Sequence, residues 1–393
     1  MLAVIETHPI QYHAPVYRAL QRDFGIPVTA VYGSDFSVIG YRDAEFATTF
    51  AWDTDLLSGY AARFLSRVSD GGTRTPETTS ASGLPRHLHE IDPKAVLLVG
   101  YSPRFYQRAL WDAWRTQKPL LFRAETTDHA SRRATIKAKL RDGMLRFFYG
   151  RCERLLYVGT RSYQHFSRLG CSAQKLVFSP YCVDTNSFQT DESGRSRLRA
   201  PARTALGVSE EETILLLSGK LVRRKRADLL VEAVKVLPKV VRDRVRVVAL
   251  GSGEEQPRLE EIARRHPAIT FTCVGFQNQS RLSAYYHAAD LLVLPSDSGE
   301  TWGLVVNEAL HHGLPCIVSD AVGCAPDLIM PGLTGEVFER GSADSLAAAL
   351  QRALRLTDNS AARETCRSRV SGYSVAKAAE GIAQAYRDVV RAG

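Results

Sequence analysis

The residues with the clearest chemical meaning lie in one segment, Pro295–Asp320, which reads PSDSGETWGLVVNEALHHGLPCIVSD. An apolar strand is expected to end at Pro295, a polar turn follows, and a helix is expected to begin near Thr301. The first backbone N–H groups of a helix have no acceptor within it and can bind an anion such as a phosphate. Here they would be the N–H groups of Trp302, Gly303 and Leu304, and Gly303 would let a phosphate approach closely.

Two carboxylates, Glu300 and Glu308, flank this predicted anion site with seven residues between them. Carboxylates repel a phosphate, but they accept hydrogen bonds from hydroxyl groups such as those of a ribose or another sugar. The pair therefore indicates a ligand that carries both phosphate and hydroxyl groups. Acidic capping of the helix would explain Glu300 but not Glu308, which lies inside an apolar helix.

Short apolar runs recur with room for helices between them, and these runs are predicted to be strands. Because they are apolar throughout rather than alternating, they indicate parallel strands buried on both faces. Two such series in succession predict an α/β fold with two doubly wound, Rossmann-like domains. The first series is Leu2–Glu6, Val28–Gly33, Ala95–Gly100, Pro119–Glu125, Arg154–Gly159 and Lys175–Ser179. The second series is Thr213–Gly219, Arg244–Gly251, Ile269–Val274, Leu291–Pro295, Pro315–Ser319 and Gly335–Phe338.

The break between the domains is expected within Asp184–Ser209, a charged stretch without an apolar period. We therefore expect a first domain over residues 1–185 and a second over residues 186–375. A segment rich in Ser, Thr and Gly, Ser66–Pro85, interrupts the first domain. It is either a functional lid or a tolerated surface insertion.

The composition excludes several classes of protein. The chain has 393 residues, 45% of them hydrophobic, which is typical of globular domains and not of disordered or fibrous chains. A net charge of +9 favours anionic partners without choosing among nucleotides, nucleic acids and acidic lipids. No apolar run is long enough to span a bilayer, and the N-terminus lacks the pattern of a signal peptide. The seven scattered cysteines contain no C-x-x-C pair, so we expect reduced thiols and a cytoplasmic location.

The Glu300-x7-Glu308 spacing within a strand, turn and helix resembles the signature of the retaining family-4 glycosyltransferases (glycosyl transferases group 1). Their fold is GT-B, in which two Rossmann-like domains face each other across a cleft, and the resemblance implies that a final helix, residues 376–393, returns to the first domain. Further stretches of the second half resemble the family in the same order, whereas the first half does so only in His8–Leu20 and Trp52–Tyr60. The stretches of the second half are Ser179–Phe188, Ser218–Val234, Ala249–Ala263, Val274–Ser296 and Val322–Phe338.

The resemblance implies a role for each residue in binding a nucleotide-diphosphate sugar. Lys220 and Lys225 would neutralise the diphosphate, and Lys220 stands at a position where the family usually has Arg. The diphosphate would lie against residues 301–304. Glu308 would bind the ribose hydroxyls. Glu300 would contact the transferred sugar and stabilise positive charge near its anomeric carbon. The backbone around Gly275 and Phe276 would contact the base.

The first half departs from the family near the reacting sugar. Many members have a histidine at the end of a central strand, where this chain reads LLFRAETTDHA. Glu125 and His129 are the candidate replacements, although a lone histidine in a loop is usually only solvated. His8 and His13 lie in the turn after the first strand, which faces the cleft in such folds. They are candidates to contact the donor or acceptor, and the alternative is a capping or packing role.

Two further patterns have competing interpretations. Asp53-Thr54-Asp55 is the Asp-x-Asp pattern that metal-dependent glycosyltransferases of another fold use, but no suitable strand precedes it, and we predict no metal site. It could instead line the acceptor side of the cleft. Segment Ser131–Arg154 has eight basic residues against two acidic ones, with Ile136, Leu140, Met144 and Phe147 on one helical face. We favour packing of this apolar stripe on the sheet. The alternative is peripheral contact with an anionic membrane, which would give access to a lipid-linked acceptor.

We therefore predict a retaining, metal-independent hexosyltransferase without a cofactor. A UDP-sugar is favoured as donor and a GDP-sugar next, and the acceptor would be a hydroxyl of a glycan, a lipid-linked molecule or a small natural product. The resemblance implies front-face attack, in which the leaving diphosphate helps to take the acceptor's proton. Two other functions fit the same sequence: a nucleotide-sugar epimerase, and a non-catalytic nucleotide- or nucleic-acid-binding protein whose affinity would fall with salt. The glutamate pair and both lysines argue against the binding protein, so no nucleic-acid partner is expected.

Overall fold

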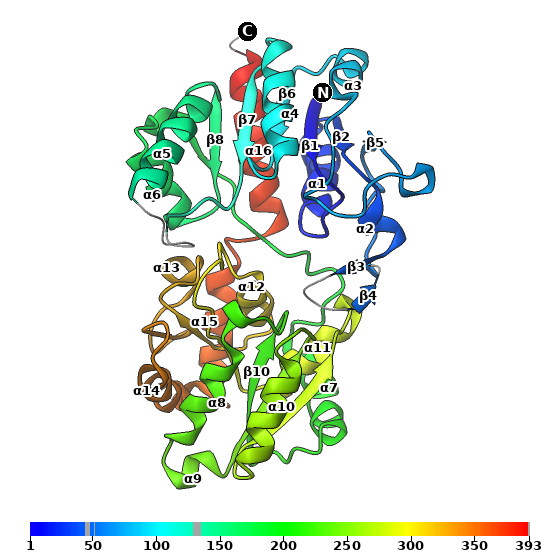
Figure 1. Cartoon of the computed structure of the whole chain (residues 1–393). Coiled ribbons are helices and arrows are strands. Elements are labelled where there is room, and N and C mark those ends of the chain that lie inside the picture. Colours follow the sequence, from blue (N-terminus) through cyan, green and yellow to red (C-terminus); the bar gives the residue numbers. More distant parts are fainter. Residues whose placement is uncertain (44–47, 51, 129–134, 392–393) are drawn as a thin grey trace.

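The computed structural model describes residues 1–43, 48–50, 52–128 and 135–391, and it contains two α/β domains, each built on a parallel sheet (Figure 1). The sheet of the first domain has the order β5-β2-β1-β6-β7-β8-β9. Its strands are β1 (Leu2–Glu6), β2 (Val28–Tyr32), β5 (Ala61–Phe64), β6 (Ala95–Leu98), β7 (Leu120–Arg123), β8 (Arg154–Tyr157) and β9 (Leu176–Phe178).

The sheet of the second domain has the order β12-β11-β10-β13-β14-β15. Its strands are β10 (Thr213–Ser218), β11 (Val245–Leu250), β12 (Thr270–Gly275), β13 (Leu291–Leu294), β14 (Cys316–Ser319) and β15 (Gly335–Phe338). In both sheets the strand order reverses beside the first strand, which is the arrangement of a doubly wound fold and the place where such folds bind ligands. The predicted fold with two Rossmann-like domains is confirmed.

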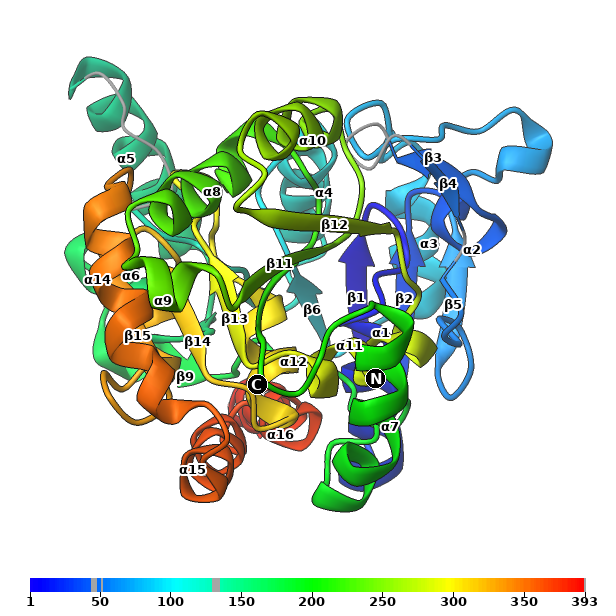
Figure 2. The same cartoon turned by 90° about the horizontal axis from the view of Figure 1, so that it is seen from below.

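Helices cover both faces of each sheet, because the strands are apolar on both sides (Figure 2). In the first domain, α1 and α16 pack on one face and the other four longer helices on the opposite face. The helices of this domain are α1 (Ala14–Phe24), α3 (Leu84–Ile91), α4 (Arg104–Arg115), α5 (Thr135–Gly150), α6 (Thr160–Arg168) and α16 (Val375–Arg391). The longer helices of the second domain are α7 (Glu192–Ala205), α8 (Ala227–Lys235), α10 (Gln256–Arg265), α11 (Gln279–Ala288), α12 (Leu304–His311), α14 (Ala343–Ala353) and α15 (Ser360–Val370).

All predicted strands form, but the structure adds three that the sequence analysis missed. They are β5 and the antiparallel pair β3 (Tyr41–Asp43) and β4 (Thr48–Phe50). Strand β5 lies at the edge of its sheet with one exposed and three half-buried residues, and its sequence, AARF, is not the apolar run that identifies a buried strand. The short helices α2 (Phe36–Ile39), α9 (Lys239–Arg242) and α13 (Ala325–Leu328) complete the α-helices of the described residues.

The charged stretch in which the domain break is expected contains a helix, α7, over Glu192–Ala205, which the sequence analysis did not predict. Asp191 caps it by accepting a hydrogen bond of 2.7 Å from the N–H of Gly194. The face that contacts α11 is fixed by arginines rather than apolar side chains: Arg203 is 1% exposed and bonds to Asp290 at 3.1 Å. Hydrophobic periodicity cannot detect a helix whose buried contacts are ionic.

The final helix α16 lies against the first domain, far from the second sheet (Figure 1). Its Gly381 packs so closely on β9 that a Cβ there would fall 2.0 Å from the carbonyl oxygen of Phe178. Tyr386 accepts a hydrogen bond of 2.9 Å from the N-terminal amine of Met1. The two ends of the described chain are thereby joined within one domain.

The two domains contact each other directly near α6 and α13. The carboxylate of Asp327 accepts hydrogen bonds from the backbone N–H of Thr160 at 2.9 Å and from its hydroxyl at 2.8 Å. Arg161 donates to the carbonyl oxygen of Asp320 at 2.6 Å. These contacts hold the carboxyl edges of the two sheets toward each other.

Part of the Ser66–Pro85 segment packs on the end of β2. Ser34 donates its hydroxyl to the carbonyl oxygen of Thr73 at 2.7 Å, and Thr79 is buried against Gly33. Its function as a lid or an insertion stays a prediction. Among the described residues, no helix is both long enough and apolar enough to cross a bilayer.

Candidate active site between the two domains

A small cavity of about 90 Å³ lies between the carboxyl edges of the two sheets. From the first domain it is lined by Gln11, Tyr12 and Trp52. From the second domain it is lined by residues that follow β10, β11 and β12 and by side chains of α11 and α12, among them Phe276 and Glu308. Residues of both halves of the chain therefore meet at the place where doubly wound folds bind ligands.

The helix after β13 begins at Leu304, three residues later than predicted. Its N-cap is Gly303, whose φ of +102° favours glycine, and a Cβ at this position would come within 3.1 Å of Leu294 and Val322 side-chain atoms. The delay has a structural cause: the carbonyl oxygens of Glu300 and Trp302 accept hydrogen bonds from Gly323 and Cys324, which holds residues 300–302 outside the helix.

This later start changes which backbone N–H groups lie at the helix N-terminus, and the anion site itself stays a prediction. Val306 already donates its N–H to the carbonyl oxygen of Gly303 at 2.9 Å, so the N–H groups left at the start of α12 are those of the N-cap Gly303 and of Leu304 and Val305, and Trp302 lies before the helix. The side chain of Trp302 is buried and donates its indole N–H to Asn307 at 2.8 Å. This hydrogen bond ties the turn before α12 to the helix itself. Thr301 lies in the turn itself, next to Glu125 of the first domain.

Lys225 and Glu300 form an ion pair close to the start of α12. Lys225 ends a short helical turn after β10, and Glu300 lies in the turn after β13, where its carboxylate also accepts a hydrogen bond of 3.0 Å from Ser296. Strands β10 and β13 are neighbours in the sheet, so both residues emerge at one edge. Lys220 lies in the same loop as Lys225 and is partly buried.

Glu308 of α12 is buried, at 3% exposure. Tyr286 of α11 donates its hydroxyl to one carboxylate oxygen at 2.6 Å, and Tyr12 of the first domain lies 3.5 Å from the other. Burial raises the pKa of Glu308 to about 7, although the two tyrosine hydroxyls lower it. Glu308 can therefore exchange a proton near neutral pH and can accept hydrogen bonds from ligand hydroxyls.

Gly275 and Phe276 lie at the end of β12, on the side of the cavity next to Trp52. Gly275 has a φ of +80°, and its carbonyl oxygen accepts a hydrogen bond of 2.9 Å from Gly251. The ring of Phe276 meets that of Trp52 edge to face, with 6.5 Å between centroids. This contact forms an aromatic wall from both domains.

The first domain contributes a buried carboxylate–imidazole pair, Glu6 and His13. Glu6 ends β1 and is 0% exposed, and one of its oxygens bonds to Nδ1 of His13. Nε2 of His13 is buried and has no hydrogen-bond partner within the described part of the chain. His8 differs, because its Nδ1 bonds to Thr7 at 2.9 Å, its ring lies against Phe36 and burial lowers its pKa to about 4. His8 is therefore uncharged at neutral pH.

Glu125 follows β7 and reaches the second domain. It hydrogen-bonds to Thr301, and burial raises its pKa, with Glu300 raising it further and His13 lowering it. Arg123, the last residue of β7, points elsewhere: it is 3% exposed and donates to Ser179 at 2.9 Å and to the carbonyl oxygen of Pro180 at 2.6 Å. His129 lies outside the described residues.

The two carboxylates of the Asp-x-Asp pattern have separate partners. Asp53 accepts hydrogen bonds from the hydroxyl of Ser280 at 2.7 Å and from its backbone N–H at 3.2 Å, across the domain boundary. Asp55 instead caps its own turn, where hydrogen bonds from Ser58 and Leu57 lower its pKa to about 2. Asp53 therefore links the two domains, whereas Asp55 stabilises a turn within the first domain.

Three residues of this site were missed by the sequence analysis: Glu6, Tyr12 and Tyr286. Glu6 had a signal, since it is a charged residue at the end of a fully buried strand. Tyr12 and Tyr286 had none, because a tyrosine in a helix or turn is usually part of the core, and only the fold brings both hydroxyls to Glu308.

Comparisons with known proteins indicate the family and the fold of this chain. Residues 199–385 match the family model described as Glycosyl transferases group 1. The lipopolysaccharide 1,2-N-acetylglucosaminetransferase of Salmonella typhimurium is 26% identical over 234 residues, which are 57% of this chain and 58% of that protein. A D-inositol 3-phosphate glycosyltransferase of Mycobacterium marinum is 32% identical over 182 residues, 45% of this chain and 38% of that protein. The chain thus matches roughly half or less of the length of these relatives.

Solved structures match along the whole chain. Sucrose-phosphate synthase from Thermosynechococcus elongatus superposes with a TM-score of 0.73 at 20% identity, covering 100% of this chain and 99% of that one. Anabaena HepE in complex with UDP-glucose gives a TM-score of 0.69 at 17% identity, covering 99% and 100%. The architecture is therefore GT-B. Residues 199–385 therefore belong to the glycosyl transferases group 1 family, as the motifs predicted.

Proposed function

We propose that this protein is a retaining glycosyltransferase that transfers a hexose-type sugar from a nucleotide-diphosphate sugar to an acceptor hydroxyl. One observation carries the proposal: Lys225, Glu300 and Glu308 gather around the start of α12, opposite the first domain. A cation and helix N–H groups suit a diphosphate, and two carboxylates suit hydroxyl groups. A nucleotide sugar carries both in one molecule.

In the proposed donor complex, Lys225 exchanges Glu300 for a donor phosphate. Lys220 and the first N–H groups of α12 bind the remaining diphosphate oxygens, and Glu300 turns to the sugar. Glu308 accepts hydrogen bonds from the ribose, and the base lies beside Gly275 and Phe276. A UDP-sugar is the favoured donor, since HepE was solved with UDP and with UDP-glucose, and a GDP-sugar comes next.

In the proposed reaction, the bond between the anomeric carbon and the diphosphate oxygen breaks as the acceptor oxygen bonds to the same face of that carbon. The acceptor proton passes to the leaving diphosphate oxygen. Lys220, Lys225 and the helix N–H groups stabilise the charge that develops on the diphosphate, and Glu300 stabilises the positive sugar. The remaining gain in rate comes from positioning.

The acceptor side of the proposal rests on the first domain. Glu125 and the Glu6–His13 pair would orient the acceptor hydroxyl, which would belong to a glycan, a lipid-linked molecule or a small natural product. Relatives are named for lipopolysaccharide and for inositol 3-phosphate. All seven cysteines are free thiols, which agrees with the proposed cytoplasmic location.

Thermal unfolding with UDP, GDP, TDP, ADP and CDP, with and without manganese, tests the donor site. A diphosphate at 100 times its dissociation constant should add about 2.7 kcal/mol to the unfolding free energy. We expect one base to stabilise the protein without metal, with this effect lost in Lys225→Ala and kept in Lys239→Ala, an exposed lysine of the same domain. No stabilisation by any diphosphate would contradict the proposal. Donor consumption without an acceptor would instead indicate an epimerase.

A further inference from the structure

An apolar surface of the first domain lies open to solvent on helices α4 and α5. We call it the α4–α5 surface and define it by Trp111, Trp114, Leu140, Met144, Phe147 and Arg151. Its side chains are large and accessible: Leu140 is 71% exposed, Phe147 59%, Met144 50% and Trp111 49%. The prediction that the stripe of α5 packs on the sheet was therefore wrong for Leu140, Met144 and Phe147. The side chain of Ile136 lies outside what the structure describes.

A second apolar face of α5 does the packing instead. Leu145, Phe148 and Tyr149 are between 1% and 5% exposed and join the core on that side of the first sheet. Phe122 of β7 contacts Phe148 edge to face at 4.8 Å. The stripe is thus not required to hold α5 in place, and Figure 2 shows α5 projecting past its neighbours.

The two helices form one continuous surface, because Arg151 joins them. Its guanidinium lies 5.1 Å from the ring centroid of Trp114 on α4 and 3.3 Å from that of Phe147 on α5. The rings of Trp111 and Trp114 are 5.2 Å apart. Arginine stacked on aromatic rings keeps its charge at the edge of an apolar area.

Positive charge surrounds this surface. Lys137, Lys139 and Arg146 are exposed on α5, and Arg115 is exposed on α4. The acidic residue of α5, Asp142, is already paired with Arg168 at 2.6 Å. The local balance is therefore cationic.

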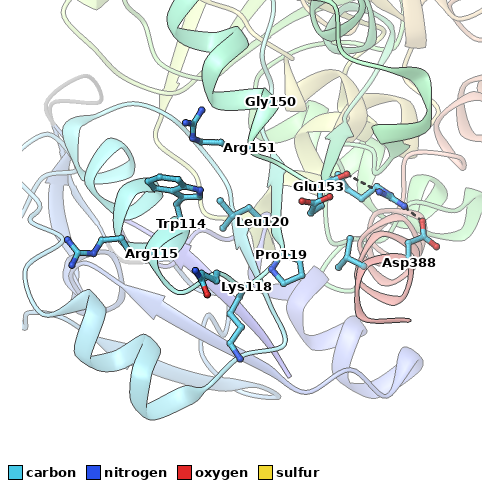
Figure 3. Close-up of a pocket in the computed structure, with 12 residues that line it drawn as sticks. Trp114, Arg115, Lys118, Pro119, Leu120, Gly150, Arg151, Glu153 and Asp388 are labelled. Carbon is cyan, nitrogen blue, oxygen red and sulfur yellow. Dashed lines mark hydrogen bonds and ion pairs between the residues drawn. The ribbon is translucent and has the colours of Figure 1, made fainter. Parts of the chain in front are cut away.

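A hollow of about 880 Å³ adjoins the surface at Trp114 and Arg151 (Figure 3). Four basic side chains line it, Arg115, Lys118, Arg151 and Arg154, against the acidic Glu153 and Asp388. Asp388 is partly neutralised by Arg154 at 3.4 Å. The hollow is large enough for a phosphate-bearing headgroup, and the excess of positive charge favours one.

We propose that the α4–α5 surface docks on a bilayer containing anionic lipids. Tryptophan, phenylalanine and leucine bordered by lysine and arginine are the composition of interfacial membrane contacts. A second copy of the chain fits worse, because a two-fold interface would place the same cationic residues face to face. The inference is independent of the proposed donor site, whose residues Lys225, Glu300 and Glu308 belong to the second domain.

Vesicle co-sedimentation of the full chain tests the proposal, with phosphatidylcholine alone and with phosphatidylcholine mixed with phosphatidylglycerol. We expect binding to the anionic vesicles only, weakened by salt. The variant Leu140→Ser/Met144→Ser/Phe147→Ser should bind about tenfold less tightly or worse. The matched control is Val236→Ser/Val240→Ser, which alters two exposed valines of the second domain (54% and 75%) and should bind normally.

Tryptophan emission gives a second readout that does not rely on the triple variant. Two of the four tryptophans, Trp111 and Trp114, lie on the surface, so anionic vesicles should shift the emission to shorter wavelength. Trp111→Phe/Trp114→Phe should remove that shift. Failure to bind anionic vesicles, equal binding to neutral ones, an equal loss in the valine control, or a dimer dispersed by the triple variant would each overturn the proposal.

Discussion

Tyr12 and Glu308, 296 residues apart in the sequence, meet between the two domains with 3.5 Å between the phenol oxygen and a carboxylate oxygen. Tyr12 belongs to the turn after the first strand, and Glu308 lies inside α12 of the second domain. Since Glu308 is the proposed ribose ligand, the hydroxyl of Tyr12 lies where a ribose hydroxyl would bind.

This relationship predicts different results for the two residues. Tyr12→Phe should leave the affinity for the preferred nucleoside diphosphate within about twofold, because the ribose replaces the phenol at Glu308. Glu308→Ala should weaken it at least about tenfold, since hydrogen bonds to a charged group are lost. Isothermal titration calorimetry measures both, with Tyr163→Phe as a control at an exposed tyrosine. An equal loss in Tyr12→Phe and Glu308→Ala would mean that Tyr12 itself binds the nucleotide.

The Lys225–Glu300 pair makes a prediction about turnover. Lys225→Ala should lower kcat at least about tenfold, because a charge that stabilises the leaving diphosphate is lost. Lys225→Arg should recover part of it. Because the two side chains are paired, the double change Lys225→Ala/Glu300→Gln should cost less than the sum of the single changes. Initial rates of sugar transfer test this, and a near-normal kcat for Lys225→Ala would contradict the site.

The raised pKa of Glu308 predicts a pH dependence of stability. Burial lifts this pKa to about 7, so between about 4.5 and 7 the folded state binds more protons than the unfolded state. This contribution to stability is complete below that window and is lost as the pH rises through it. Urea unfolding of the native chain and of Glu308→Gln at pH 5 and pH 7.5 measures the effect. The variant should gain stability relative to the native chain by up to about 3 kcal/mol at the higher pH. A difference that does not change with pH would refute this.

The same pKa predicts the pH dependence of binding. Ribose hydroxyls donate to the ionised carboxylate, so the affinity for the nucleoside diphosphate should rise with pH through about 7. Glu308→Gln should lack that rise.

The buried Arg203 should be essential to the second domain. Its guanidinium donates to Asp290 at 3.1 Å and to the carbonyl oxygen of Ala288 at 2.7 Å. Arg203→Ala would leave Asp290 with Arg199 alone, at 2.8 Å, and would leave buried carbonyl oxygens without a donor, so it should lower the free energy of unfolding by about 3 kcal/mol. Arg197→Ala, an exposed arginine of the same helix, should change it by less than about 0.5 kcal/mol. Chemical denaturation followed by circular dichroism compares the two, and equal effects would contradict the role of Arg203.

Much of the fold and part of the site follow from local sequence. Apolar runs identify buried parallel strands because both faces of such strands must leave water, and every predicted run became a strand. The glutamate spacing around the turn at Gly303 placed Glu300 in the turn after a strand and Glu308 inside the helix that follows. The assignment to the family rests on these same local motifs.

Only the tertiary structure decided the contacts between distant segments. The start of α12 moved to Leu304 because the backbone of residues 323–324 captures the turn before it. Helix α7 depends on the pair Arg203–Asp290, and α5 packs with a face other than its most regular apolar stripe. The spacing of apolar residues predicts which face of a helix is buried on average. The face that is actually buried depends on the segments that pack against the helix, and these come from distant parts of the sequence.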